Sequence, residues 1–152
     1  MVITQAVLAD IPDLVKLLGW LFEQECEFES KPDLQGRSLK KIILNPAIGI
    51  IYIAKKSDRI LGMVSLLFTE STALGSRVSL LEDMVVTPND RSQGIGSKLL
   101  KHAIEESNRL GCKRITLLAD LENHQARRFY QKHGFHKSAM VPYRFIIESV
   151  IK

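Results

Sequence analysis

The stretch LLEDMVVTPNDRSQGIG, residues 80–96, decides the fold of this chain. Residues 78–87 are mostly apolar and rich in valine and leucine, which favours a strand, and Pro88 stops it because proline has no N–H for a sheet ladder. Residues 94–109 then repeat apolar side chains at helical spacing. The stretch is therefore predicted to be a long strand joined to an amphipathic helix by a loop that contains glycine.

The loop has the features of an anion site. Gly94 and Gly96 let the backbone approach a ligand closely. The start of a helix leaves N–H groups unpaired and carries the positive end of the helix dipole, which suits phosphate groups. Arg91 adds positive charge and the Ser97 hydroxyl adds a donor. A dinucleotide-binding fingerprint is excluded because Leu99 stands where its third glycine belongs, and the Gly-Lys-Ser/Thr of a P-loop is also absent.

The rest of the chain alternates between the same two element types. We expect strands at residues 2–6, 50–55, 60–68 and 114–119, helices beginning near Asp10 and spanning residues 35–44 and 123–133, a polar loop at 69–77, and one or two final strands between 135 and 147. Strands gathered early and a strand–helix–strand–helix–strand unit late predict an α/β (α+β) fold with a mixed sheet.

Composition narrows the class of protein. A chain of 152 residues predicts one domain, residues 1–152. Neither a signal peptide nor an apolar run of membrane-spanning length is present in the sequence given, so we expect a cytoplasmic protein with no membrane partner. The two cysteines and four histidines form no metal-binding pattern, and no metal is expected. The net charge of +4 is scattered, which argues against a nucleic-acid partner.

The motif residues resemble those of a known family. Arg91-x-x-Gly94-x-Gly96 matches the Arg/Gln-x-x-Gly-x-Gly/Ala signature of the GNAT superfamily of acyl-CoA N-acyltransferases, and residues 81–88 look like the strand that precedes it. The family's second motif is matched by Asn123, Ala126, Phe129, Tyr130, Gly134 and Phe135. This resemblance implies a twisted, mostly antiparallel sheet of six to seven strands, flanked by about four helices and splayed between its fourth and fifth strands.

The resemblance also implies acetyl-CoA as the acetyl donor and assigns residues to it. In the family, strand backbone pairs with the pantetheine arm, loop N–H groups hold the pyrophosphate, and the second motif supplies an asparagine and a tyrosine beside the arm and the sulfur. The matching positions here are Met84, Val85, Val86, Arg91, Ser92, Gln93, Gly94, Ile95, Gly96, Ser97, Asn123 and Tyr130. Family members are often dimers, so the resemblance makes a homodimer an expectation.

Acetyl transfer to an amine needs a proton acceptor, since an alkylammonium has no lone pair. Glu82 is the candidate base, because a carboxylate within an apolar strand is unusual without a partner or a role. Asp83 points to the opposite face by strand alternation and meets substrate only if the strand bulges. Tyr130 is the candidate acid for the departing thiolate. The structural alternatives are a paired buried carboxylate for Glu82 and a core aromatic for Tyr130; Asn123 also fits a helix N-cap.

The acceptor is only weakly encoded. Glu23, Glu25, Glu27 and Glu29 form an acidic patch near the first helices, which usually shape the acceptor site in this family. The patch would attract a small cationic primary amine, of the polyamine or lysine kind, and a solvated acidic helix face is the structural alternative. An amine on a protein, an aminoglycoside-type drug, and a sensor domain that binds acetyl-CoA without turnover remain alternatives.

Overall fold

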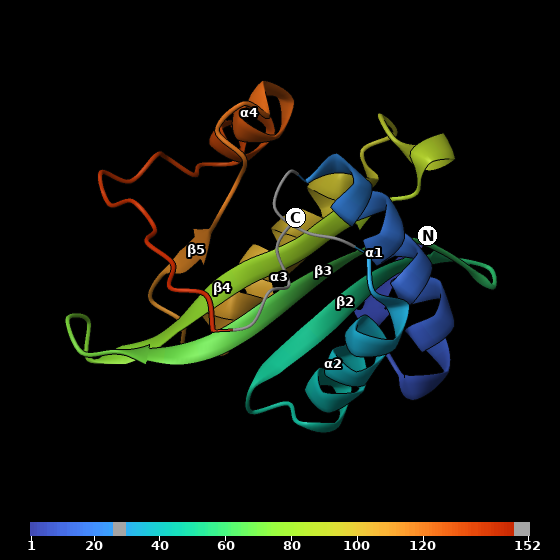
Figure 1. Ribbon diagram of the computed structural model, residues 1–152, viewed down its shortest axis with the longest axis horizontal. Helices are drawn as coiled ribbons and strands as arrows, with labels where there is room; N and C mark the ends of the chain where they lie inside the picture. Colours follow the sequence, from blue (N-terminus) through green and yellow to red (C-terminus); the bar gives the residue numbers. More distant parts are fainter. Residues whose placement is uncertain (26–29, 148–152) are drawn as a thin grey trace.

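The computed structural model describes residues 1–25 and 30–147 of the chain, and Figure 1 shows how its elements are arranged. In chain order they are β1 (Val2–Gln5), α1 (Ile11–Gln24), α2 (Pro32–Leu44), β2 (Gly49–Lys56), β3 (Arg59–Ser71), β4 (Ser76–Val86), α3 (Ile95–Arg109), β5 (Ile115–Leu117) and α4 (His124–Lys132), with short 3-10 turns η1 (Leu8–Asp10) and η2 (Pro88–Asp90). None of the helices in the described ranges combines the length and apolarity needed to cross a membrane.

The strands form one sheet in the order β1-β2-β3-β4-β5. All neighbouring strands are antiparallel except β4 and β5, which run parallel and are joined through α3. The predicted α+β fold with a mixed, mostly antiparallel sheet and four flanking α-helices is therefore confirmed. The prediction of six to seven strands is wrong for the described residues, which form five.

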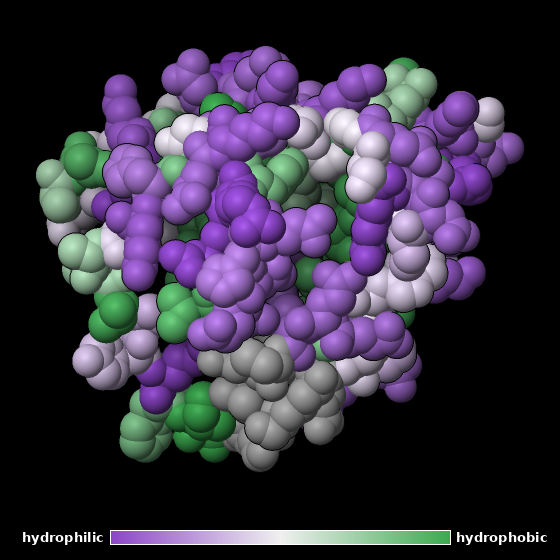
Figure 2. All heavy atoms as spheres, turned by 90° about the horizontal axis from the view of Figure 1, so that it is seen from above, coloured by the Kyte–Doolittle hydropathy of each residue, from purple (hydrophilic) through white to green (hydrophobic). Residues whose placement is uncertain are grey.

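The absent strands are those expected between residues 135 and 147. Within the described residues, no backbone hydrogen bond ties residues 136–147 to β5, which offers an edge of only three residues. Pro142 also removes one donor from the middle of the segment. The side chains of Tyr143, Phe145 and Ile147 remain 93%, 91% and 92% exposed. In Figure 2, apolar side chains gather toward the left edge, the side where Figure 1 places the segment after α4.

The polar stretch 69–77 is mostly strand rather than the predicted loop. The hairpin between β3 and β4 turns only at residues 72–75. Glu70 and Arg77 stand opposite each other in the ladder, and opposite charges across strands stabilise such pairs. The Arg77 guanidinium also lies 4.9 Å from the centre of the Phe68 ring. Cross-strand contacts therefore outweigh the loop-like composition.

Helices cover both faces of the sheet. Strand alternation in β2 sends Ile51 and Ile53 to one face and Tyr52 and Ala54 to the other. The first face packs against α1 and α2, through the buried residues Leu14, Leu17, Leu18 and Leu39. The second packs against α3, through Ile95, Leu99, Leu100 and Ala103, and α4 adds Phe129 and Tyr130 at its margin. Each face therefore has its own apolar core.

A β-bulge interrupts β4. Ser65 of β3 pairs with Glu82 and Met63 pairs with Val85, so Asp83 and Met84 together stand opposite a single residue. Asp83 has a φ of +53°, in the left-handed region that aspartate tolerates better than most side chains. The extra residue redirects the strand that follows it.

The strands β4 and β5 part soon after they meet. Their ladder consists of the pairs Ser79–Ile115, Leu80–Thr116 and Leu81–Leu117. Beyond Leu81, β4 continues to Val86 while β5 has ended. The backbone of residues 82–86 therefore has no partner on the β5 side, as the family resemblance implies.

Candidate active site

A cavity of about 60 Å³ opens where β4 and β5 part. It is lined by Leu21 and Glu25 at the end of α1, Leu81, Glu82, Asp83 and Met84 of β4, Leu117 and Leu118 at the end of β5, and Tyr130 of α4. In Figure 1, α4 and the last turn of α1 both lie toward the end of β4 that borders this opening. Three carboxylates and one phenol thus meet at one place on an otherwise apolar lining.

The bulge brings Asp83 into this cavity together with Glu82. Burial raises the pKa of Asp83 to about 7, and repulsion from the carboxylates of Glu82 and Glu25 adds to the rise. The nearby hydroxyl of Ser65 partly offsets this rise in the pKa. Asp83 therefore exchanges a proton near neutral pH, the range in which a general base works best.

Ser65 itself is a buried polar residue on β3, opposite Glu82. Its Oγ has no hydrogen bond of ordinary geometry to any described residue. A buried hydroxyl without a partner costs free energy. The position of Ser65 next to Asp83 therefore indicates a role in the protonation of that carboxylate. The sequence analysis did not single out Ser65, because one serine in a strand has no distinguishing pattern.

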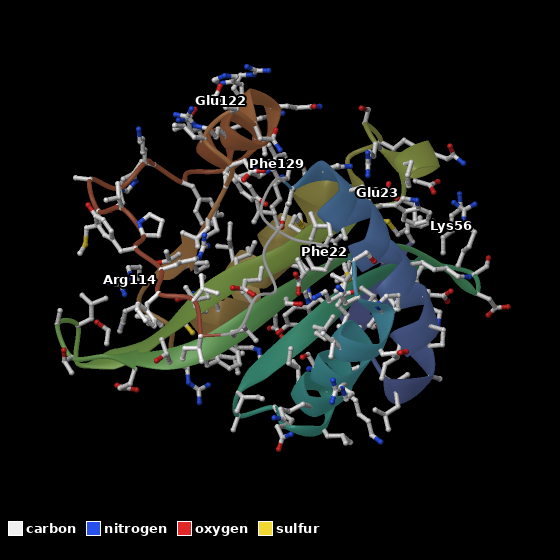
Figure 3. The ribbon with its side chains drawn as sticks, viewed as in Figure 1. Phe22, Glu23, Lys56, Arg114, Glu122 and Phe129 are labelled. Atoms are coloured by element: carbon white, nitrogen blue, oxygen red, sulfur yellow. The ribbon has the colours of Figure 1, made fainter. Side chains whose placement is uncertain are left out.

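Glu82 lies at the exposed rim of the cavity rather than within an apolar core. The structural alternative of a buried carboxylate paired with a basic residue therefore does not describe it. Its catalytic role stays a prediction. Of the acidic patch, Glu25 lines the cavity and Glu23 lies on the last turn of α1, as Figure 3 shows, while Glu27 and Glu29 lie outside the described residues.

Tyr130 faces the same cavity from α4. Its ring meets those of Phe129 and Phe135 edge-on, at centroid distances of 5.2 and 5.8 Å. Burial, followed by repulsion from Glu25, raises the pKa of the Tyr130 phenol to about 12. The hydroxyl therefore keeps its proton across the ordinary pH range. Tyr130 is thus a packed aromatic whose phenol lines the cavity, and its role as the acid stays a prediction.

For Asn123 the sequence left two interpretations open, a helix N-cap and a contact with the cofactor, and the structure shows the first. Its Oδ1 accepts a hydrogen bond from the Ala126 backbone N–H at 3.1 Å, which makes it the N-cap of α4. It is exposed and does not line the cavity. The cap is thus observed, and contact with a cofactor arm stays a prediction.

The loop before α3 keeps its backbone donors available. Gly94, with a φ of +82°, is the N-cap of α3 and offers no side-chain cap. No hydrogen bond from the described residues uses the backbone N–H groups of residues 95–97. A Cβ at Gly94 would meet no atom within 4 Å, and one at Gly96 would lie 3.5 Å from Phe129 Cζ, an ordinary contact. The left-handed φ by itself favours glycine at position 94, whereas at Gly96 neither the backbone nor the packing requires glycine and close approach of a phosphate group would.

The Arg91 side chain is hydrogen-bonded to two other parts of the protein. Its Nε donates to the Val86 carbonyl oxygen at 3.0 Å. Its two Nη atoms donate to the Gln24 side-chain oxygen, at 2.8 and 2.9 Å, with the Gln24 amide turned so that its oxygen faces Arg91. The charge predicted for the rim of the anion site is present, but three of the five guanidinium donors point to protein.

A larger, shallow hollow of about 330 Å³ lies on α2. Leu34, Arg37, Ser38 and Lys41 line it, and no carboxylate or tyrosine is among them. It therefore lacks a proton acceptor of the kind that amine acetylation needs. Within the described ranges, no three histidine, cysteine or acidic side chains gather in the manner of metal ligands.

Comparison with known proteins decides the family. The model of the acetyltransferase (GNAT) family matches residues 14–135. The chain belongs to the GNAT acetyltransferase family. It is accordingly an N-acetyltransferase that takes its acetyl group from acetyl-CoA, and the loop donors and open glycines described above suit the phosphates of that donor.

Individual relatives agree with this assignment. The acetyltransferase is 32% identical over 117 residues to the uncharacterised N-acetyltransferase YhfO of Bacillus subtilis, covering 76% of this chain and 78% of that protein. It is 30% identical over 132 residues to glucosamine 6-phosphate N-acetyltransferase of Trypanosoma brucei brucei, covering 84% and 83%. The crystal structure of a probable acetyltransferase superposes with a TM-score of 0.84 at 25% identity, covering 98% and 99% of the two chains.

The glycine loop yields a first prediction. Gly94→Ala places a Cβ on a residue with a φ of +82°, which costs roughly 1–2 kcal/mol and distorts the loop. We expect the affinity for acetyl-CoA, measured by calorimetry, to fall about tenfold or more. Gly111→Ala is the matched control, because Gly111 has a φ of +85° in the turn after α3. It should lower stability similarly and leave affinity unchanged; equal affinities for both variants would contradict the loop's assignment.

Proposed function

We propose that this acetyltransferase moves the acetyl group of acetyl-CoA directly onto the primary amine of a small cationic acceptor, of the polyamine or lysine kind. The observation that carries the proposal is the cavity where β4 and β5 part, bordered by the carboxylates of Glu25, Glu82 and Asp83. Burial is the main cause of the raised pKa of Asp83, and a cationic amine that enters this cavity relieves the repulsion from Glu82 and Glu25 that adds to it. A phosphorylated acceptor would add to that repulsion.

One relative is named for an acceptor of a different charge. The Trypanosoma brucei brucei relative is named for glucosamine 6-phosphate, an amine that carries an anion. Among the described residues, no arginine or lysine lines the cavity here. The lining therefore favours an acceptor whose charge is positive, and the amine of a protein or of an aminoglycoside-type drug is the next class to compare.

The residues divide the chemical work between proton transfer and binding. Acetyl-CoA supplies the acetyl group as an activated thioester. The acceptor must lose a proton before its nitrogen can attack, and two carboxylates can receive it. Asp83 has the pKa better matched to neutral pH, whereas Glu82, the base that the sequence predicts, stands at the exposed rim and draws the ammonium group inward. No cysteine is among the described residues that line the cavity, which favours direct transfer.

Tyr130 holds the second proton. Its raised pKa keeps the phenol neutral, so the hydroxyl can donate to the departing sulfur. The backbone N–H groups of residues 82–86 that have no partner on β5 are available to the acetyl carbonyl. The cavity thus has a proton acceptor on β4 and a proton donor on α4.

An acceptor screen tests the proposal. Thiol release from acetyl-CoA is measured with putrescine, spermidine, lysine, glucosamine 6-phosphate, an aminoglycoside and a peptide with a free N-terminus. We expect kcat/KM for a diamine or polyamine to exceed that for glucosamine 6-phosphate by about tenfold or more, since one charged contact near the surface is worth up to roughly 1 kcal/mol and several act here. Acetyl-CoA binding without thiol release on any amine would instead indicate a sensor, and preference for the phosphorylated amine would refute the cationic class.

The pH dependence separates the two carboxylates. A base with a raised pKa is protonated and inactive below that pKa, so kcat should rise with pH through about 7 in the natural protein. Asp83→Asn should abolish this rise of kcat with pH and lower kcat about 100-fold or more. Glu82→Gln should keep the rise of kcat with pH and raise the acceptor KM. The opposite pattern would assign the base to Glu82, as the sequence predicts.

Removing the phenol hydroxyl tests the donor. Tyr130→Phe keeps the ring contacts with Phe129 and Phe135 but removes the proton. We expect kcat to fall about 100-fold, with acetyl-CoA affinity by calorimetry within twofold of the natural protein. Phe129→Leu, on the same helix, is the control for packing. A Tyr130→Phe variant with an unaltered rate would remove Tyr130 from catalysis.

A further inference from the structure

The contacts of Arg91 join three parts of the molecule. Through its backbone, Arg91 begins the loop that supplies the N–H donors before α3. Through Nε it holds the Val86 carbonyl at the end of β4, and through both Nη atoms it holds Gln24. Because a guanidinium is planar and its donors are fixed in a fork, these contacts orient one another.

Gln24 is the last residue of α1, and Glu25 follows it directly. Glu25 has left the helix, with a φ of −90° and a ψ of 140°, and lines the cavity opposite β4. Its carboxylate raises the pKa of both Asp83 and Tyr130, so it lies near both groups. The position of Glu25 thus depends on where the end of α1 is held.

A second arginine anchors the same region from another side. The Arg59 guanidinium, at the start of β3, forms an ion pair with Asp90, which also accepts a hydrogen bond from the Thr87 hydroxyl. This contact fixes η2 to the β2–β3 hairpin and does not involve α1. The two arginines therefore hold neighbouring residues of one connection to two different parts of the fold.

The partner of Arg91 is neutral, whereas the partner of Arg59 is a carboxylate. Hydrogen bonds to an amide oxygen fix a guanidinium without cancelling its charge. Arg91 can therefore contribute positive potential to the anion loop while its donors are bound to protein. Its charge and its hydrogen bonds are separable by substitution.

We propose that Arg91 is a positioning residue for the acceptor side of the cavity: through Gln24 it holds the end of α1, and with it Glu25, against β4. This inference rests on the proposed function, because it assigns the acceptor to the cavity that Glu25 lines. It gives the motif arginine a task that its charge alone does not explain. Loss of the contact should weaken acceptor binding rather than acetyl-CoA binding.

The test compares the acceptor KM with the dissociation constant of acetyl-CoA, using the best amine of the screen. Gln24→Ala should raise the acceptor KM about tenfold or more, the factor expected from a hydrogen bond to a charged group, and leave acetyl-CoA affinity within twofold. Arg91→Ala should raise the acceptor KM by the same factor, and the double variant should raise it no further, since both remove one contact. Additive effects, or an unchanged KM in Gln24→Ala, would overturn the inference.

Conservative variants separate charge from contact. Gln24→Glu keeps an acceptor for the guanidinium and should retain the natural KM, while its added negative charge weakens acetyl-CoA binding. Arg91→Lys keeps the charge without the fork and should raise the KM as Arg91→Ala does. Arg59→Ala is the matched control, because it releases the same connection from the hairpin and should leave the acceptor KM unchanged. A raised acceptor KM in Arg59→Ala would show that any loosening of the connection between β4 and α3 weakens acceptor binding, and would overturn the inference.

A readout independent of turnover keeps the two proposals distinguishable. Failure of the natural protein to acetylate any amine would refute the proposed function alone. Amide hydrogen exchange over residues 21–25, measured with acetyl-CoA bound, then tests the contact itself. Protection should fall in Arg91→Ala and Gln24→Ala and persist in Arg59→Ala. Equal protection in all three variants would overturn the contact's role.

Discussion

The early end of the ladder between β4 and β5 is the constraint on which the site depends. Three residue pairs join the strands, and the longer strand then continues alone. A sheet that remained paired to Val86 would use the backbone groups of residues 82–86 internally and leave no space between β4 and α4. Because the strands part, Glu82, Asp83 and Met84 border a cavity instead, and α4 contributes Tyr130 to its lining.

The helices around this opening have different relations to it. α3 is held by a buried apolar face, so the loop at its start has a fixed position relative to β4. α1 also packs through buried leucines, but its last residues pass beyond the apolar core toward the cavity. Side-chain hydrogen bonds therefore have more influence at the end of α1 than along its length, where packing alone determines the geometry.

Much of this arrangement could be predicted from the sequence, and the exceptions share a cause. Periodicity and the positions of proline and glycine located the helices and the long strands, because these signals act within one element. The hairpin at residues 69–77 and the segment after residue 135 were misjudged, because contacts across strands decide both: Glu70 pairs with Arg77, whereas residues 136–147 find no partner among the described residues. The partners of Arg91 and Asp83 come from distant parts of the chain, and no local pattern encodes them.

The bulge in β4 has a consequence for how relatives should be aligned and strands exchanged. Leu81 belongs to the core beneath α3 and Val85 to the core beneath α1, although strict alternation over four residues would place them together. A gap of one residue between Glu82 and Met84 therefore exchanges the environments of every later position in the strand. If a homologous strand without the extra residue were grafted here, the side chains after the bulge would face the opposite core, even where the two sequences look similar. When strands are exchanged between relatives, the number of residues in the strand should therefore be matched before sequence identity is considered.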